Sequence, residues 1–164
     1  MDSSLYLPFY AILKFNASLL FIETWLEFMF KVDERIESSC VLLHHDVLSD
    51  VYLKNAREYP WLILVPRVVG VRELDELNDE AQLQLWNELN FWSLSLKKIY
   101  QPDKINVGAL GNVVSMLHVH IIARFHQDPL WPQGLWQAAL ETYPYEEREL
   151  LTVLEAFASY KNQR

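Results

Sequence analysis

The strongest constraint on the fold is one long helical pattern that lies between two groups of strand-like segments. Its apolar side chains recur at spacings of four and three, at Leu85, Leu89, Trp92, Leu96 and Ile99. Such spacing predicts a helix with one buried face. Asn78 is a suitable N-cap for this helix, and the Gln101-Pro102-Asp103 segment ends it. The apolar face of so long a helix has to be covered by another layer, and the neighbouring segments supply one.

The segments on both sides of the helix are typical of β-strands. Residues 40–55 (CVLLHHDVLSDVYLKN) contain two short apolar runs around turn-prone residues, which predicts an antiparallel hairpin. Residues 60–67 (PWLILVPR) form a nearly continuous apolar run, typical of a strand buried on both faces in the middle of a sheet. After the helix, residues 105–110 (INVGAL) and 113–125 (VVSMLHVHIIARF) predict two more strands, joined through Gly111-Asn112.

These patterns predict an α+β domain, in which an antiparallel sheet of about five strands packs on one long helix. The spacing of Leu150, Leu154 and Phe157 adds a C-terminal helix within residues 145–160. With 164 residues, of which 51% are hydrophobic, the chain is long enough for one core and short for two. We therefore expect a single domain over residues 29–164.

Residues 1–28 form an apolar N-terminal extension whose status the sequence leaves open. Pro8, Lys14 and Glu23 interrupt it, whereas a membrane-spanning helix needs about 20 mostly apolar residues in a row. The residues before the apolar run include Asp2 and no basic residue, unlike a secretory signal. We expect neither membrane insertion nor targeting. The extension is either an appended helix or a consequence of the choice of start site.

Charge and cysteine content narrow the classes of partner. The chain has 14 Lys and Arg against 22 Asp and Glu, a net charge of -8, which argues against binding to nucleic acid by general attraction. A small anionic ligand therefore needs a local site. Cys40 is the only cysteine, so that no disulfide forms within the chain, and this suits the reducing cytoplasm.

The segment with the clearest chemistry is MLHVHIIAR, residues 116–124. In an extended strand alternate side chains share one face, which places His118, His120 and Arg124 together. Two imidazoles about 7 Å apart suit phosphoryl transfer, in which His118 attacks and His120 handles the proton of the leaving group. The groups expected to meet the negative charge are Arg124, Asn112, Ser115 and the backbone N–H groups that Gly108 and Gly111 leave accessible.

Residues 106–124 (NVGALGNVVSMLHVHIIAR) resemble the signature of the histidine triad (HIT) family, a Gly-containing stretch that leads into alternating histidines. Upstream, PWLILVPR resembles the family's strand ending in L-V-x-P, and the long helix lies between the two. The D-x-x-W-P piece at residues 128–132 is similar to short bacterial HIT proteins labelled diadenosine tetraphosphate hydrolases. The resemblance spans residues 30–136.

This resemblance implies a cofactor-free nucleotide hydrolase or nucleotidyl transferase. It further implies a homodimer that acts on dinucleoside polyphosphates or nucleoside phosphoramidates. By position, His118 matches the nucleophile that forms a nucleotidyl-histidine, and His120 matches the histidine near the leaving group. Asn112 matches a phosphate-contacting Gln, Asn106 a polar position near the nucleotide, and Asn55, across a gap, a ribose-contacting Asn or Asp.

Two departures from the family pattern keep other hypotheses open. Met116 stands where the family has its first histidine, and Trp61 replaces the usual histidine just before the apolar strand. The alternative function is therefore a nucleotide-binding regulatory module with little catalysis. A third hypothesis treats His118 and His120 as metal ligands, but the sequence offers no obvious third ligand, and we expect no metal site.

Several of these residues also have simpler interpretations. Asn106 and Asn112 are typical of turns, because Asn tolerates left-handed backbone conformations. Arg124 also fits an exposed surface charge. Trp131 and Trp136 fit the edge of a core or a subunit interface better than a surface on which a base stacks.

Overall fold

The computed structural model describes residues 30–136 and 141–162. Contacts divide the chain into two units, residues 1–31 with 67–69 and residues 32–66 with 70–164, and the fold below is that of the second unit. The predictions for residues 1–28 lie outside the described residues, and the single domain over 29–164 stays a prediction. Within the described ranges, no helix combines the length and the apolar character that a membrane crossing requires.

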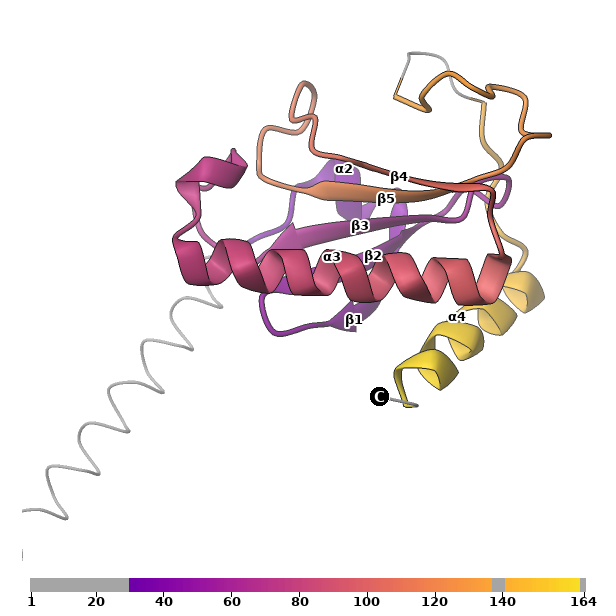
Figure 1. Ribbon diagram of the computed structural model, residues 1–164, viewed down its shortest axis with the longest axis horizontal. Helices are drawn as coiled ribbons and strands as arrows, with labels where there is room; N and C mark the ends of the chain where they lie inside the picture. Colours follow the sequence, from indigo (N-terminus) through magenta and orange to yellow (C-terminus); the bar gives the residue numbers. More distant parts are fainter. Residues whose placement is uncertain (1–29, 137–140, 163–164) are drawn as a thin grey trace, which may run out of the picture. The chain divides into compact units, whose positions relative to one another are not determined.

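A five-stranded antiparallel sheet forms the centre of this unit (Figure 1). Its strands are β1 (Cys40–His45), β2 (Ser49–Lys54), β3 (Trp61–Pro66), β4 (Lys104–Gly108) and β5 (Val119–Arg124), in the spatial order β1-β2-β3-β5-β4. β3 lies in the middle and is buried at all six positions, as its unbroken apolar run predicts. The predicted hairpin is the β1–β2 pair. The predicted α+β class and the antiparallel sheet of five strands are confirmed.

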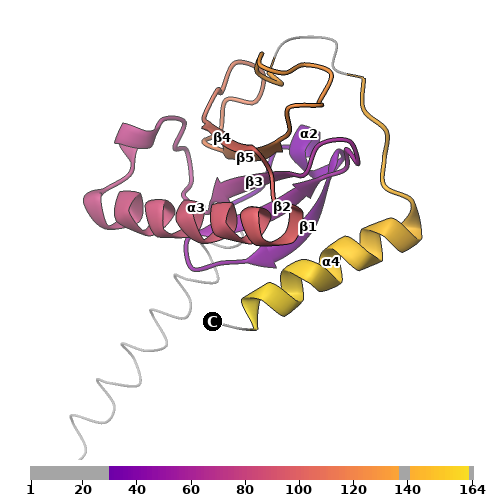
Figure 2. The same cartoon turned by 45° about the vertical axis from the view of Figure 1, so that its right-hand side comes forward.

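The long helix α3 (Asp79–Tyr100) lies along one face of the sheet, as Figures 1 and 2 show. The side chain of Asn78 caps it by accepting a hydrogen bond from the Ala81 N–H at 2.8 Å. Gln101 ends it in a left-handed conformation. The predicted C-terminal helix is α4 (Glu147–Lys161), and it packs on α3 through Phe157, whose ring lies 6.1 Å from that of Trp92. The short helices α2 (Glu34–Glu37) and η2 (Leu74–Glu76) complete the described elements.

Side-chain alternation in β3 and β5 gives the sheet two different faces. Leu62, Leu64 and Ile121 have no exposed surface, which fits the face that α3 covers. Trp61 and His120 point to the opposite face. Figure 2 shows the loop that follows β5 (orange) on the side of the sheet away from α3. This second face is where the histidines of the sequence motif lie.

The strand that contains His120 is shorter than predicted. Residues 113–125 were expected to be extended throughout, whereas β5 begins at Val119 and residues 109–118 form a loop. The ladder between β3 and β5 ends at the pair Leu64–Val119, and β3 itself ends at Pro66, which has no N–H to donate. The segment before β5 pairs elsewhere, because the Leu117 N–H donates to the Val71 carbonyl at 3.0 Å. His118 therefore lies just outside the strand.

Candidate active site

A cavity of about 390 Å³ opens on the face of the sheet where His120 lies; we call it the histidine cavity. β2, β3, β5 and the loops 109–118 and 125–136 all contribute to its wall. The polar and aromatic residues in the wall are Lys54, Trp61, Asn112, His118, His120 and Trp136. The register places His120 between Ile63 of β3 and Gly108 of β4, so that this imidazole has a strand on both sides.

His118 is held in one orientation by the backbone. Its Nδ1 lies 2.8 Å from the carbonyl oxygen of Met116. A carbonyl can only accept a hydrogen bond, so Nδ1 of the neutral imidazole is protonated and Nε2 has the free lone pair. Among the described residues none hydrogen-bonds to this Nε2. His118 is 7% exposed and lines the cavity, and in this neutral tautomer its Nε2 is the ring nitrogen with a lone pair for a ligand.

His120 is held in the opposite way by Trp61. The indole Nε1 of Trp61 lies 3.0 Å from Nδ1 of His120, and an indole N–H can only donate. The neutral imidazole of His120 is therefore protonated on Nε2. Burial, and after it the electrostatic effects of His118 and Lys54, lower the pKa of His120 to about 3. His120 is thus neutral at pH 7, with its ring edge-on to that of His118 at 4.9 Å.

The loop 109–118 is tied to the segment that precedes β1. The guanidinium of Arg35 donates to the Val113 carbonyl at 2.6 Å, and the backbone N–H of Asp33 donates to the sulfur of Met116 at 3.3 Å. Gly111 adopts a positive φ of 65°, which glycine tolerates without strain. Gly111 and Asn112 line the cavity, so that two of the predicted phosphate-binding positions lie together with the histidines.

Arg124 and Asn106 do not line this cavity but bind each other. Arg124 is 1% exposed and forms a two-pronged ion pair with Asp128, at 2.6 and 2.9 Å. Its Nη1 also donates to the Asn106 side chain at 3.1 Å and to the Gln133 carbonyl at 2.9 Å. The sequence-based interpretation of Arg124 as an exposed surface charge is wrong. Its guanidinium holds the loop 125–136 against the ends of β4 and β5.

Two further predicted residues lie away from the histidine cavity. The side chain of Asn55 accepts a hydrogen bond from the backbone N–H of Tyr145 at 2.9 Å, which ties the segment before α4 to the end of β2. Ser115 is exposed in the loop before β5 and is absent from the described wall of the cavity. The structure thus brings His118, His120, Gly111 and Asn112 together.

The arrangement of strands, helix and paired imidazoles can be compared with known proteins. The sequence profile of the HIT domain matches residues 35–127. The chain belongs to the HIT family. This membership supports a nucleotide-binding or hydrolase role for the protein.

Three solved HIT structures are similar to this one. A histidine triad protein from Sinorhizobium meliloti 1021 is 39% identical, with a TM-score of 0.77 over 80% of this chain and 96% of that one. One from Marinobacter aquaeolei VT8 is 38% identical, with a TM-score of 0.78 over 82% and 98% of the two chains. One from Bradyrhizobium japonicum is 33% identical, with a TM-score of 0.77 over 80% and 98%. No curated protein matches the chain.

Lys54 and Trp136 are among the residues of this HIT domain that line the cavity without having been predicted to bind there. Lys54 ends β2, and its strand position next to buried Leu53 gave no sign of a site. Trp136 was assigned to a core edge or an interface, but it lies in the cavity wall, with its ring 6.0 Å from that of His120. A Cβ on Gly108 would come within 3.2 Å of this indole, so Trp136 packs closely against the backbone of β4 at this glycine.

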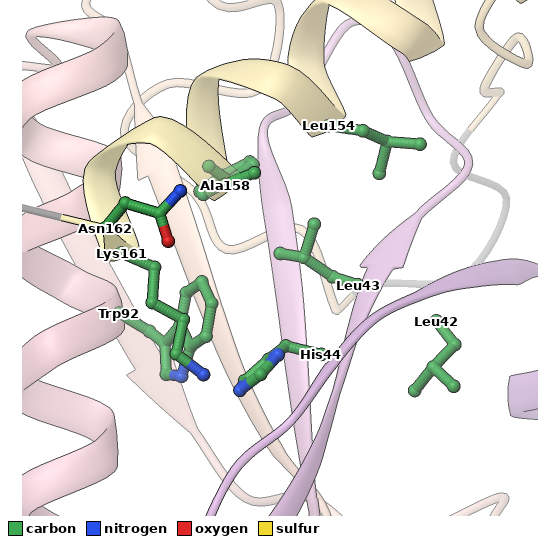
Figure 3. Close-up of a pocket in the computed structure, with 9 residues that line it drawn as sticks. Leu42, Leu43, His44, Trp92, Leu154, Ala158, Lys161 and Asn162 are labelled. Carbon is green, nitrogen blue, oxygen red and sulfur yellow. The ribbon is translucent and has the colours of Figure 1, made fainter.

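The HIT domain has a second and larger cavity of about 470 Å³ between β1, α3 and α4; we call it the α4 cavity (Figure 3). His44, Trp92 and Lys161 are among its lining residues. The ring of His44 is tilted against that of Trp92 at 6.2 Å, and no hydrogen bond from a described residue reaches the His44 imidazole. In the part of the chain that the structure describes, no three His, Cys, Asp or Glu side chains are close enough to hold a metal ion.

Proposed function

We propose that this HIT protein cleaves a phosphoanhydride or phosphoramidate bond of a nucleotide substrate through a covalent nucleotidyl intermediate on His118. The observation that supports it most is the hydrogen bond from His118 Nδ1 to the Met116 carbonyl, because it leaves the Nε2 lone pair for attack. The substrate classes are dinucleoside polyphosphates and nucleoside phosphoramidates. No cofactor takes part in the proposed reaction.

The proposed reaction consists of two displacements at one phosphorus. The Nε2 lone pair of His118 forms an N–P bond, while the P–O or P–N bond to the leaving group breaks. The leaving group takes the electron pair and a proton from solvent. The Met116 carbonyl accepts the Nδ1–H and stabilises the positive charge that develops on the ring. Water then attacks the phosphorus, the N–P bond breaks and water releases a proton. The products are a nucleoside monophosphate and free His118.

The negative charge of the transferred phosphoryl group needs donors in the histidine cavity. The Nε2–H of His120, the side chain of Asn112, the backbone of Gly111 and the ammonium group of Lys54 are the donors that line it. Arg124 acts on this cavity indirectly, because its donors go to Asp128, Asn106 and Gln133. Contact of Asn55 and Ser115 with the substrate stays a prediction from the family resemblance and the sequence.

Intact-protein mass spectrometry tests the covalent step. The parent protein and the His118→Asn variant are mixed briefly with a panel of adenylated substrates, and product release is followed in the same samples. We expect an adduct of the mass of AMP on the parent alone, together with products. Asn is similar in size and cannot attack, so the variant should show neither. Equal turnover by the two proteins would refute the proposal.

Met116 favours a second candidate function, a nucleotide-binding module with little catalysis. At this position the family has its first histidine, and here the thioether sulfur accepts the N–H of Asp33. Nucleotide binding by the parent protein, measured by calorimetry, without adduct or products from any substrate would support this second candidate. Assembly as a homodimer and a cytoplasmic location stay predictions, which cross-linking and cell fractionation test.

A further inference from the structure

Trp61 begins β3 and lies diagonally across from His120 on the same face of the sheet. The register pairs Trp61 with Ile122 and Ile63 with His120, so that indole and imidazole are offset by two residues on neighbouring strands. Their ring centroids are 5.3 Å apart, and the rings are inclined at 70°. Trp61 is 8% and His120 is 9% exposed, so that little water competes for the hydrogen bond between them.

This contact selects one protonation state of His120 out of three. A protonated imidazole has an N–H on both nitrogens, and so its Nδ1–H would face the indole N–H, donor against donor. The neutral tautomer with the proton on Nδ1 would suffer the same clash. The neutral tautomer with the proton on Nε2 fits, because its Nδ1 accepts from Trp61. By donating to Nδ1, Trp61 therefore determines that the proton of the neutral His120 ring is on Nε2.

The titratable neighbours of His120 act in the same direction. His118 lies beside it in the loop just before β5, and Lys54 lines the same cavity from the end of β2. Both are cationic when protonated, and both disfavour a positive charge on His120. His118 has the reverse tautomer, with its Nδ1–H on the Met116 carbonyl. At the two Nε2 positions of the cavity, one imidazole thus offers a lone pair and its neighbour an N–H.

We infer that Trp61 is a positioning residue that holds His120 as a neutral hydrogen-bond donor through Nε2–H. On the proposed function, on which this part of the inference rests, that N–H meets an oxygen of the transferred phosphoryl group. His120 then stabilises negative charge and does not serve as a cationic acid for the leaving group. The tryptophan that replaces a family histidine is in this way part of the site's chemistry.

Long-range ¹H–¹⁵N correlation spectra of the ¹⁵N-labelled full chain test the tautomer without any substrate. The His120 signals are assigned from their loss in His120→Asn. We expect one Nε2–H tautomer of His120 throughout the neutral pH range in the parent protein and a mixture of tautomers in Trp61→Phe, which keeps a ring but loses the donor. Trp136→Phe removes another aromatic wall residue of the same cavity, and its His120 should stay in the single tautomer.

Two results overturn the inference: a protonated or Nδ1–H His120 in the parent, or an unchanged Nε2–H tautomer in Trp61→Phe. Should Trp61→Phe not fold, the indole N–H of Trp61 tests the same contact. Its resonance should move and exchange faster in His120→Asn, and an unmoved resonance overturns the inference.

Kinetics separate the positioning role from a space-filling one. With a substrate that the parent turns over, Trp61→Phe should lose about tenfold in kcat with little change in KM, the lower end of the scale for groups that orient a metal-bound imidazole. A change in KM alone would assign Trp61 to the cavity wall and overturn the inference. If the parent turns over no substrate, the proposed function fails, while the NMR spectra still decide the tautomer.

Discussion

The histidine cavity and the α4 cavity of this HIT domain contain the same kinds of side chain. Each has an imidazole, a lysine and a tryptophan in its wall, and the α4 cavity is the larger, at about 470 Å³ against 390 Å³. The difference is in what holds the imidazoles. In the histidine cavity a carbonyl and an indole fix the ring nitrogens of His118 and His120. In the α4 cavity, His44 has only a tilted ring contact with Trp92 among the described residues.

This comparison shows that composition and volume do not identify a reactive site. The two walls are also held differently. β3 and β5 pair residue by residue beneath the histidine cavity, and a buried ion pair fixes the loop with Trp136. The α4 cavity is closed by aromatic and aliphatic contacts between α3 and α4, such as that of Trp92 with Phe157. A reactive site needs a nucleophilic lone pair and a hydrogen-bond donor that are held in fixed orientations. Among the described residues of these two cavities, only the hydrogen bonds of the histidine cavity provide such orientation.

The most direct way to break the comparison is to remove one imidazole from each cavity. We expect His118→Asn to lower kcat at least about 10³-fold, because a nucleophile has no substitute. His44→Asn should stay within about twofold of the parent, since the ring does not face the substrate. Initial rates with the best substrate of the panel measure both, and thermal unfolding checks that each variant is folded. A large loss of kcat in His44→Asn, or no loss in His118→Asn, would contradict the assignment of the active site to the histidine cavity.

The ion pair beneath the Trp136 loop should give the next largest effect. Asp128→Asn leaves Arg124 buried without its charged partner, and we expect the free energy of unfolding to fall by about 3 kcal/mol. Trp136 should move away from the cavity, and KM should rise. Asp46→Asn, beside the α4 cavity, is the matched change, because it keeps an acceptor for the Trp92 N–H and should cost about 1 kcal/mol or less. Urea unfolding compares the two, and equal losses would contradict the positioning role of Arg124.

The dependence of stability on pH separates the cavities further. The folded pKa of His120 is about 3, below its usual value of 6.5, because of burial. As the pH falls below 6.5, His120 is protonated in the unfolded chain but not in the folded one. The free energy of unfolding that this residue contributes above pH 6.5 is therefore progressively lost. Between pH 7 and pH 5 this loss is about 2 kcal/mol. His120→Gln should remove it, and His44→Gln should keep it. If the free energy of unfolding depends on pH in the same way in the parent and in His120→Gln, the lowered pKa of His120 is contradicted.

The sequence predicted the local directions of side chains well and their distant partners poorly. The spacing of Leu85, Leu89 and Trp92 gave the buried face of α3, because helical periodicity is a property of neighbouring residues. Alternation correctly set His118 and His120 in the same wall. It put Arg124 on that face as well, but Asp128, in the following loop, takes up the guanidinium, and no periodicity reports such a pairing.

The same limit applies to the wall residues that the sequence did not predict. Lys54 reaches the cavity from β2, far along the chain from the histidines, and only the pairing of the strands brings it there. Trp136 reaches it because the loop 125–136 folds back over Gly108. Neither residue belongs to a motif. Their place in the site depends on the register of the sheet and on the conformation of one loop, which is tertiary information.

Lys54 provides the smallest of the expected effects and the sharpest test of electrostatics. Of the described residues that line the histidine cavity, it alone has a permanent positive charge, and a phosphate there would gain a charge-assisted hydrogen bond. We expect Lys54→Met, which keeps the length of the side chain, to raise KM about tenfold and to leave kcat nearly unchanged. Lys161→Met removes the corresponding charge from the α4 cavity and should leave both constants unchanged. An equal effect of the two variants would show that the substrate responds to the overall charge of the protein. That result would contradict phosphate binding in the histidine cavity.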